Sequence, residues 1–183
     1  MTAPSHTAAA PSRYRLSGPG RVWVLTGLIA VAAVVLYLLG IRGLEGLAAP
    51  FHIPWWALAA LFAAAETFVI HLQFRRQAES FSLGEIVTVL ALFFASPTEL
   101  VVAQVIGGAV ALAVHRRQSL VKLAFNLAHF GLGACVAAAI FHALAPALDP
   151  VGPLGWIAAF AAILGADVLG AILVGLAISL AER

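Results

Sequence analysis

The chain has 183 residues, of which 63% are hydrophobic and 10% are charged, and its formal net charge is +2. Soluble domains carry roughly 25% charged residues, so this composition excludes an ordinary soluble domain and indicates a lipid-facing surface. The basic residues stand in short clusters, which argues against nucleic-acid binding, and a lone Cys135 excludes an intrachain disulfide.

The N-terminal part of the chain combines a polar tail with a first apolar run. Residues 1–20 are rich in Ala, Pro, Ser and Thr, which predicts a disordered cytoplasmic tail. The run over residues 21–41 is long enough to span a bilayer, and no small-residue cleavage site separates it from later apolar segments. We therefore expect a retained transmembrane helix rather than a signal peptide.

The next two apolar segments predict helices over residues 54–74 and 83–95. The first begins at Pro54, a favourable first helical position, and carries Trp55 and Trp56 where an interfacial belt is expected. The second is short, and the Ser-Leu-Gly-Glu sequence at 82–85 has the spacing of a capping box at its start.

Three longer segments complete the pattern, over residues 97–115, 119–145 and 154–181. Ser96 and Glu99 form a second capping box, with proline at the first helical position. The last segment would be about 40 Å long at 1.5 Å per residue, so it needs tilt or a cytoplasmic extension. The predicted fold is therefore all-α: a polytopic integral membrane bundle of six transmembrane helices in the bacterial cytoplasmic membrane.

The basic residues predict the orientation of this bundle. Lys and Arg in short loops favour the cytoplasmic side, and six crossings would place nine of the ten basic residues there. These nine are Arg13, Arg15, Arg21, Arg75, Arg76, Arg116, Arg117, Lys122 and Arg183. Only Arg42 would face outward. The pattern predicts that both termini are cytoplasmic.

Small residues predict close helix contacts. They recur on three helices: Gly107, Gly108 and Ala111; Gly131 and Cys135; and Ala166, Gly170 and Gly175. Such spacing allows backbones to approach closely. Packing within one bundle explains it best, and a homodimer interface is the alternative.

Four polar residues are the main candidates for ligand binding or proton sensing. Counted from the helix ends at 1.5 Å per residue, Glu66, Asn126, His129 and Asp167 converge on one layer. Ionisable groups inside a span are costly and need partners. A carboxylate there either protonates or pairs, and histidine or asparagine can be the partner. The alternative is a hydrogen-bonded network that only holds the helices in register.

Four further residues are secondary candidates. His71 and His115 stand beside arginine pairs, where a solvated interfacial role is expected. Glu85 is expected to cap a helix, and Gln104 to form an interhelical hydrogen bond. Haem ligation by His71, His115 and His129 is not favoured, because their depths differ. Neither a cofactor nor a metal is expected, and HExxH, GxSxG and P-loop motifs are absent from the sequence, so we do not expect an enzyme.

Residues 80–141 resemble a known group of proteins. A Ser-Leu-Gly-Glu helix start, an apolar helix ending at Ser-Pro, a Gly/Ala-rich helix ending in Arg-Arg and a following Lys-Leu-Ala-Phe-Asn are similar to multi-span bacterial membrane sensor domains. These domains precede GGDEF, EAL or HD-GYP cyclic-di-GMP modules. The resemblance implies a sensory input domain whose last helix signals to a cytoplasmic effector, fused or in trans. The alternative is a transporter subunit like the substrate-binding membrane components of vitamin uptake systems.

Overall fold

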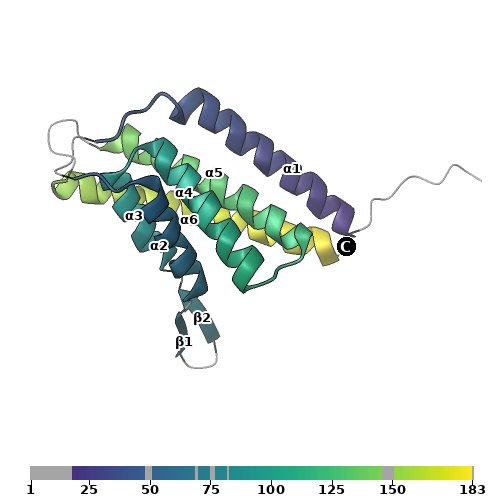
Figure 1. Ribbon diagram of the computed structural model, residues 1–183. Coiled ribbons are helices and arrows are strands. Elements are labelled where there is room, and N and C mark those ends of the chain that lie inside the picture. The colour runs from purple at the N-terminus through teal and green to yellow at the C-terminus, as the bar shows by residue number, and fades with distance from the viewer. Residues whose placement is uncertain are drawn as a thin grey trace, which may run out of the picture.

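The computed structural model describes residues 18–47, 51–68, 70–74, 77–81, 83–145 and 151–182. Within these ranges the protein is mainly helical, with six α-helices and one two-stranded hairpin (Figure 1). Four helical segments are long and apolar enough to cross a membrane: Gly20–Ile41, Pro97–His115, Leu120–Leu144 and Pro153–Glu182. These segments support the prediction of a helical membrane protein. Residues 1–17 of the predicted tail lie outside the described ranges.

Helix α1 (Gly18–Leu36) lies along one edge of the bundle and continues as a π-helical turn, η1 (Tyr37–Ile41) (Figure 1). It packs mainly against α5 and less against α6. Many of its large apolar side chains are exposed, including Leu28 and Val31. An apolar helix with an uncovered apolar face is typical of a helix that contacts lipid.

Helix α2 (Trp55–Thr67) is shorter than the predicted helix over 54–74. The chain leaves the helix at Phe68, and strands β1 (Ile70–Phe74) and β2 (Gln77–Phe81) follow, paired antiparallel with Phe74 opposite Gln77. The prediction of helix beyond Thr67 was therefore wrong. The reason for the strand is visible in the sequence, because polar and apolar residues alternate in Ile-His-Leu-Gln-Phe, and this period of two is typical of strands.

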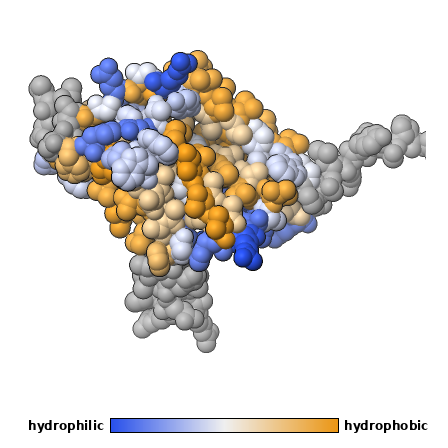
Figure 2. Space-filling view, viewed as in Figure 1, coloured by the Kyte–Doolittle hydropathy of each residue, from blue (hydrophilic) through white to orange (hydrophobic). Residues whose placement is uncertain are grey.

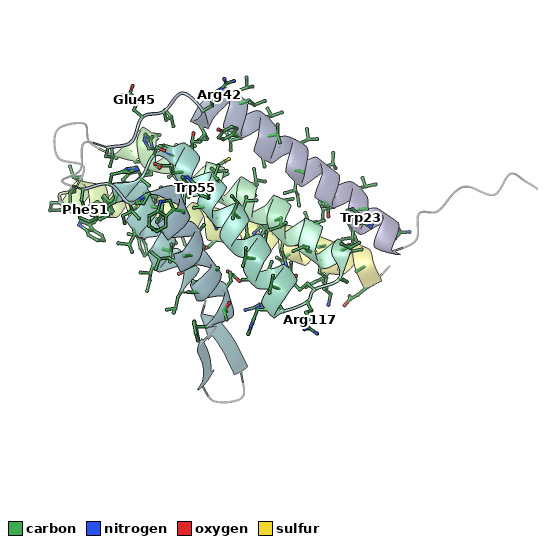
Figure 3. The ribbon with its side chains drawn as sticks, in the orientation of Figure 1. Trp23, Arg42, Glu45, Phe51, Trp55 and Arg117 are labelled. Carbon is green, nitrogen blue, oxygen red and sulfur yellow. The ribbon has the colours of Figure 1, made fainter. Side chains whose placement is uncertain are left out.

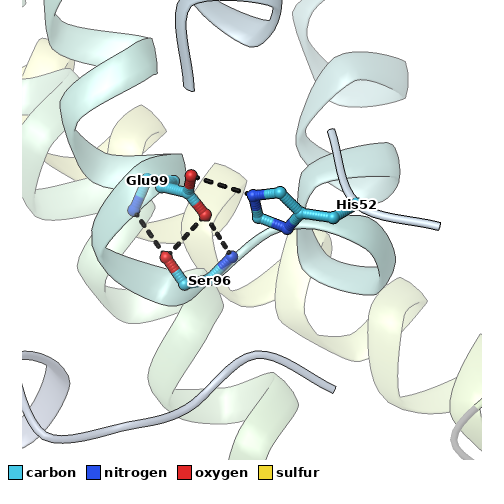
Figure 4. A network of polar contacts seen from close by, with 3 residues as sticks. All are labelled: His52, Ser96 and Glu99. Atoms are coloured by element: carbon cyan, nitrogen blue, oxygen red, sulfur yellow. Dashed lines mark hydrogen bonds and ion pairs between the residues drawn. The ribbon is translucent and has the colours of Figure 1, made fainter. Parts of the chain in front are cut away.

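Helices α3 (Gly84–Phe94) and α4 (Pro97–Val110) are separated by a sharp turn, and α4 continues as a π-helical turn, η2 (Ala111–His115). The capping box predicted at the start of α4 is present. The Ser96 backbone N–H donates to Glu99 Oε2 over 2.9 Å, and the Glu99 N–H donates to Ser96 Oγ over 3.3 Å (Figure 4). His52 Nε2 lies 3.1 Å from Glu99 Oε1 and joins this cap to the segment before α2. The cap predicted at Ser82 lies outside the described residues.

Helices α5 (Leu120–Leu144) and α6 (Pro153–Glu182) are the longest, and they pack against each other. Phe93 of α3 lies at the centre of an aromatic cluster with both. Its ring centroid is 5.3 Å from that of Phe141 and 4.9 Å from that of Trp156. Phe93 and Phe141 are buried and Trp156 is partly exposed, and these ring contacts hold the start of α6 against the ends of α3 and α5.

The bundle has two polar ends and an apolar middle. Figure 2 shows hydrophilic residues near the upper left edge and the lower edge of this face, with mostly apolar residues between them. Arg42 and Glu45 lie at one end and Arg117 at the other (Figure 3). The starts of α1 and α5 and the end of α6 share one surface pocket, so α1 begins at the end of the bundle where α6 finishes.

Several glycines of the predicted small-residue pattern serve contacts within the bundle. A Cβ on Gly107 would collide with the Ala59 carbonyl oxygen and would lie 2.7 Å from Phe62 Cβ, so α2 and α4 meet backbone to backbone. A Cβ on Gly108 would lie 2.7 Å from the Phe130 ring. At Gly175, by contrast, an added Cβ meets nothing within 4 Å.

Candidate functional site

The described part of the chain contains a cavity of about 300 Å³ between α2, α3, α4, α5 and α6. We call it the polar cavity, because six polar side chains line it: Glu66, Glu85, Thr88, Gln104, His129 and Asp167. Small or apolar residues, including Phe130, Gly133 and Ala166, form the rest of the wall.

The polar cavity exists because α2 and α3 are short. Their 13 and 11 residues cover about 20 Å and 16 Å, less than the roughly 30 Å of a bilayer core, whereas α5 and α6 run past them. Glu66 lies in the last turn of α2 and Glu85 in the first turn of α3. Both carboxylates therefore stand where the short helices end, and they face the longer helices across the cavity.

The carboxylates occupy different depths. Glu85 and Asp167 line the polar cavity and are exposed, while Glu66 is half-buried. Asp167 interacts electrostatically with Glu85, which repels it, and with His129, which attracts it when protonated. Glu85 and Asp167 thus place two like charges near the same cavity wall as the His129 imidazole.

The His129 ring is held in place on two sides. It stacks on Phe125 at a centroid distance of 6.1 Å and lies 5.9 Å from the Phe130 ring. It also approaches the α6 backbone, because a Cβ on Gly170 would lie only 2.7 Å from His129 Nε2. Gly170 therefore allows α5 and α6 to come close enough for His129 and Asp167 to share one wall.

Two residues of the cavity wall, Thr88 and Gln104, carry neutral polar side chains. Thr88 is buried and donates its hydroxyl hydrogen to the Gly84 carbonyl oxygen over 3.0 Å, which leaves its oxygen able to accept. Gln104 Oε1 is buried and has no hydrogen-bond partner among the residues that the structure describes. A buried acceptor without a donor costs about 1–3 kcal/mol, so this atom needs an explanation.

Asn126 does not join the other three primary candidates. Its Nδ2 donates to Gln118 Oε1 over 2.8 Å, and it lines a second pocket with Ser119 and Lys122 at the end of the bundle. The structure thus brings Glu66, His129 and Asp167 to one cavity and places Asn126 elsewhere. The Asn126 amide bonds to Gln118 in the loop before α5. Counting residues along a helix estimates depth in the membrane and does not reveal such a local partner.

The secondary candidates also separate. Glu85 and Gln104 line the polar cavity, whereas His115 is exposed at the end of η2. His71 belongs to β1, where its backbone pairs with Ser80, rather than to the end of α2 as predicted. No group of three or more His, Cys, Asp or Glu within the described ranges could hold a metal ion.

Three features of the site were not predicted. Thr88 lies one helical turn after Glu85, and that spacing could have identified it. Gly170 had been assigned to helix packing alone. Arg116 donates from Nη2 to the Glu66 carbonyl oxygen over 2.7 Å, so it caps the end of α2 beside the cavity. This last contact joins residues 50 apart and has no local sequence signal.

Comparisons with known proteins add no identification: no family model, no curated protein and no solved structure matches this chain.

Proposed function

We propose that this chain is a sensory input domain of the bacterial cytoplasmic membrane, with six membrane crossings and both termini inside the cell. In this proposal a small polar ligand or a proton enters the polar cavity and changes the position of α6. That helix then regulates a cytoplasmic effector of the GGDEF/EAL or HD-GYP kind, fused or in trans, and the domain itself has no catalytic role.

The observation that carries the proposal is the double role of α6. Its middle, at Asp167 and Gly170, forms one wall of the polar cavity. The helix then continues without interruption to Glu182, about 22 Å beyond Asp167 at 1.5 Å per residue. A change of contacts at the cavity can therefore move the far end of a rigid element, which is a common way to transmit a signal.

The distribution of charge supports the six-span orientation. Arg116, Arg117 and Lys122 cluster between η2 and the first turn of α5, at the end of the bundle where α1 begins and α6 finishes. Arg42 lies at the opposite end (Figure 3). Positive charge in short loops favours the cytoplasmic side, so this end would face inward. Reporter fusions at both termini and after Glu45 test the orientation: only the fusion after Glu45 should be external.

The function is tested in cells with the intact gene, by measuring cyclic-di-GMP. Asp167→Asn and His129→Ala should change its level or its response to the environment at unchanged protein abundance. Glu45→Gln, the same type of change at an exposed loop position, should have no effect. Variants that alter only protein abundance would refute the sensory role and leave the cavity as a structural network. Uptake of a solute that depends on a partner ATPase would favour the transporter alternative instead.

A further inference from the structure

A second pocket, of about 500 Å³, lies where α1 and α5 begin and α6 ends, and we call it the Lys122 pocket. Most of its wall is apolar and comes from all three helices: Val22 of α1, Val121 and Phe125 of α5, and Val174, Ala177, Ile178 and Ala181 of α6. Its other lining residues are polar and belong to the start of α5: Ser119, Lys122 and Asn126. The pocket therefore joins an apolar recess to polar residues that carry a positive charge.

The apolar recess lies beside the point where the three helices close on one another. Ile29 of α1, Phe125 of α5 and Leu173 of α6 pack in one hydrophobic cluster, and Phe125 also lines the pocket. Farther along α6, Val174 and Ile178 line the pocket and remain exposed. Apolar side chains left uncovered in a recess mark a surface that contacts another apolar group, and in a bilayer an acyl chain is that group.

The polar residues of the pocket offer hydrogen-bond donors. Lys122 is exposed, and the one ion pair in the described part of the chain joins His52 and Glu99, so no carboxylate there neutralises the Lys122 ammonium. The Ser119 hydroxyl makes no capping bond to the N–H groups of α5, all of whose residues the structure describes. Asn126 donates to Gln118 and has a second amide hydrogen. An ammonium, a hydroxyl and an amide N–H together suit the oxygens of a phosphate group.

The surrounding charge is positive and lies at the level of an interface. Arg21, Arg117 and Lys122 outnumber the acidic Glu182 among the described residues of these helix ends and of the loop before α5. Trp23 and Arg117 lie at this end of the bundle (Figure 3), and an exposed tryptophan such as Trp23 is typical of the headgroup region. Membrane orientation requires only positive charge in short loops. It does not require an apolar recess beside one of these charges.

We propose that the Lys122 pocket binds an anionic phospholipid of the surrounding bilayer. Its phosphate lies at Ser119, Lys122 and Asn126, and one acyl chain lies against the apolar side chains of α1 and α6. Basic pockets between helices on the cytoplasmic side take such headgroups. This inference goes beyond the proposed function, and only its assignment to the cytoplasmic leaflet rests on the proposed orientation. The bound lipid contacts the last turns of α6 and holds them against α1 and α5.

Binding is measured with the purified protein in dodecyl maltoside micelles, by native mass spectrometry and by thermal unfolding, with phosphatidylglycerol as the probe. Phosphatidylglycerol should bind saturably and raise the unfolding temperature. Phosphatidylcholine with the same acyl chains has no net charge, and glycerol phosphate has the charge without the chains; both should bind at least about fivefold more weakly. Equal effects of the two lipids, or of phosphatidylglycerol and glycerol phosphate, would overturn the proposal.

A pair of charge variants locates the headgroup. Lys122→Gln should weaken phosphatidylglycerol binding about fivefold, the contribution of one basic residue at an anionic lipid surface. Lys122 is exposed, so this variant is expected to fold. Arg42→Gln removes one positive charge from an exposed position at the opposite end and should bind as the unmodified protein does. Equal losses in the two variants would show a general attraction to net charge and overturn the site.

A second pair of variants locates the acyl chain without changing the charge. Ala181 is exposed and lines the pocket, so Ala181→Trp is expected to fold and to occupy part of the recess. It should weaken phosphatidylglycerol binding at least about fivefold, as the loss of one basic residue does. Ala32→Trp places the same ring at an exposed position of α1 outside the pocket and should leave binding unchanged. Normal binding in Ala181→Trp, or an equal loss in Ala32→Trp, would overturn the role of the recess.

The two proposals fail separately. If phosphatidylglycerol binds as described but variants of the polar cavity leave cyclic-di-GMP unchanged, the sensory function is wrong and the lipid site stands. If those variants change cyclic-di-GMP but the two lipids bind alike, the lipid site is wrong and the sensory function stands.

Discussion

Gly107 provides the sharpest test of the packing described above. It stands on α4 where that helix crosses α2, and an alanine Cβ would collide with the Ala59 carbonyl oxygen. The same Cβ would lie 2.7 Å from Phe62 Cβ and 3.0 Å from the Ala63 nitrogen. All three obstacles belong to the backbone or to its first side-chain atom, so no rotamer change can relieve them.

The expected magnitude follows from two opposing terms. Overpacking a close contact costs about 1–3 kcal/mol, and we take the upper end because backbone must move. Alanine is better than glycine in a helix by about 1 kcal/mol, which offsets part of the cost. Gly107→Ala should therefore lower the free energy of unfolding by about 2 kcal/mol, a change of about thirtyfold in the equilibrium constant.

Gly175→Ala is the matched control, because an added Cβ there meets nothing within 4 Å. It should gain up to about 1 kcal/mol from helix propensity alone. Unfolding in mixed micelles, with dodecyl sulfate as the denaturant and circular dichroism as the signal, measures both variants. If Gly107→Ala proves as stable as Gly175→Ala, α2 and α4 are not in backbone contact and the boundary of the polar cavity is misplaced.

Three further predictions concern local features. Ser96→Ala should lower the free energy of unfolding by about 1 kcal/mol, because α4 loses its cap. His52→Ala should lower it by less than about 0.5 kcal/mol, because the His52 side chain is 59% exposed. Equal losses of the two variants in the same dodecyl sulfate titration would contradict this order. Arg117 has a positive φ of 45°, a backbone conformation that strains alanine but not glycine. Arg117→Gly should therefore be about 1 kcal/mol more stable than Arg117→Ala, since both variants remove the charge, and chemical unfolding of the pair measures the difference. The buried thiol of Cys135 should resist maleimide in the folded protein and react on unfolding, as mass spectrometry would record; rapid labelling under native conditions would show that α1 does not cover it.

Sequence reasoning predicted the parts of the fold that depend on local chemistry. The bounds of α5 and α6 agree with the predicted segments within one residue, because Ser119 and Pro153 mark their starts and long apolar runs follow. The Ser96–Glu99 cap was predicted from spacing alone. The end of α2 was not predicted correctly. The segment after Thr67 was interpreted as a continuing helix, although its alternation of polar and apolar residues favours a strand.

The candidate site was predicted only in part, for a geometric reason. Counting residues from the ends of helices estimates depth, and it correctly brought Glu66, His129 and Asp167 together. It gives no information on which neighbour faces each side chain. Asn126 therefore bonds to Gln118 instead of lining the cavity, whereas Gln104, which was predicted as a secondary candidate, lines it. The ranking of Gln104 could not have been improved without knowing that α2 and α3 end early.

The shortness of α2 and α3 has an electrical consequence. In an energised bilayer the potential falls across the low-dielectric material, at about 2.3 kcal/mol per unit charge for each 100 mV. Helices α2 and α3 extend over only about 16–20 Å, so water can approach the polar cavity from the side of the β1–β2 hairpin. The voltage drop is then concentrated over the remaining thickness of the bilayer. A charged group that enters from the hairpin side would cross little of the voltage drop, so its occupancy of the polar cavity should be nearly independent of membrane voltage.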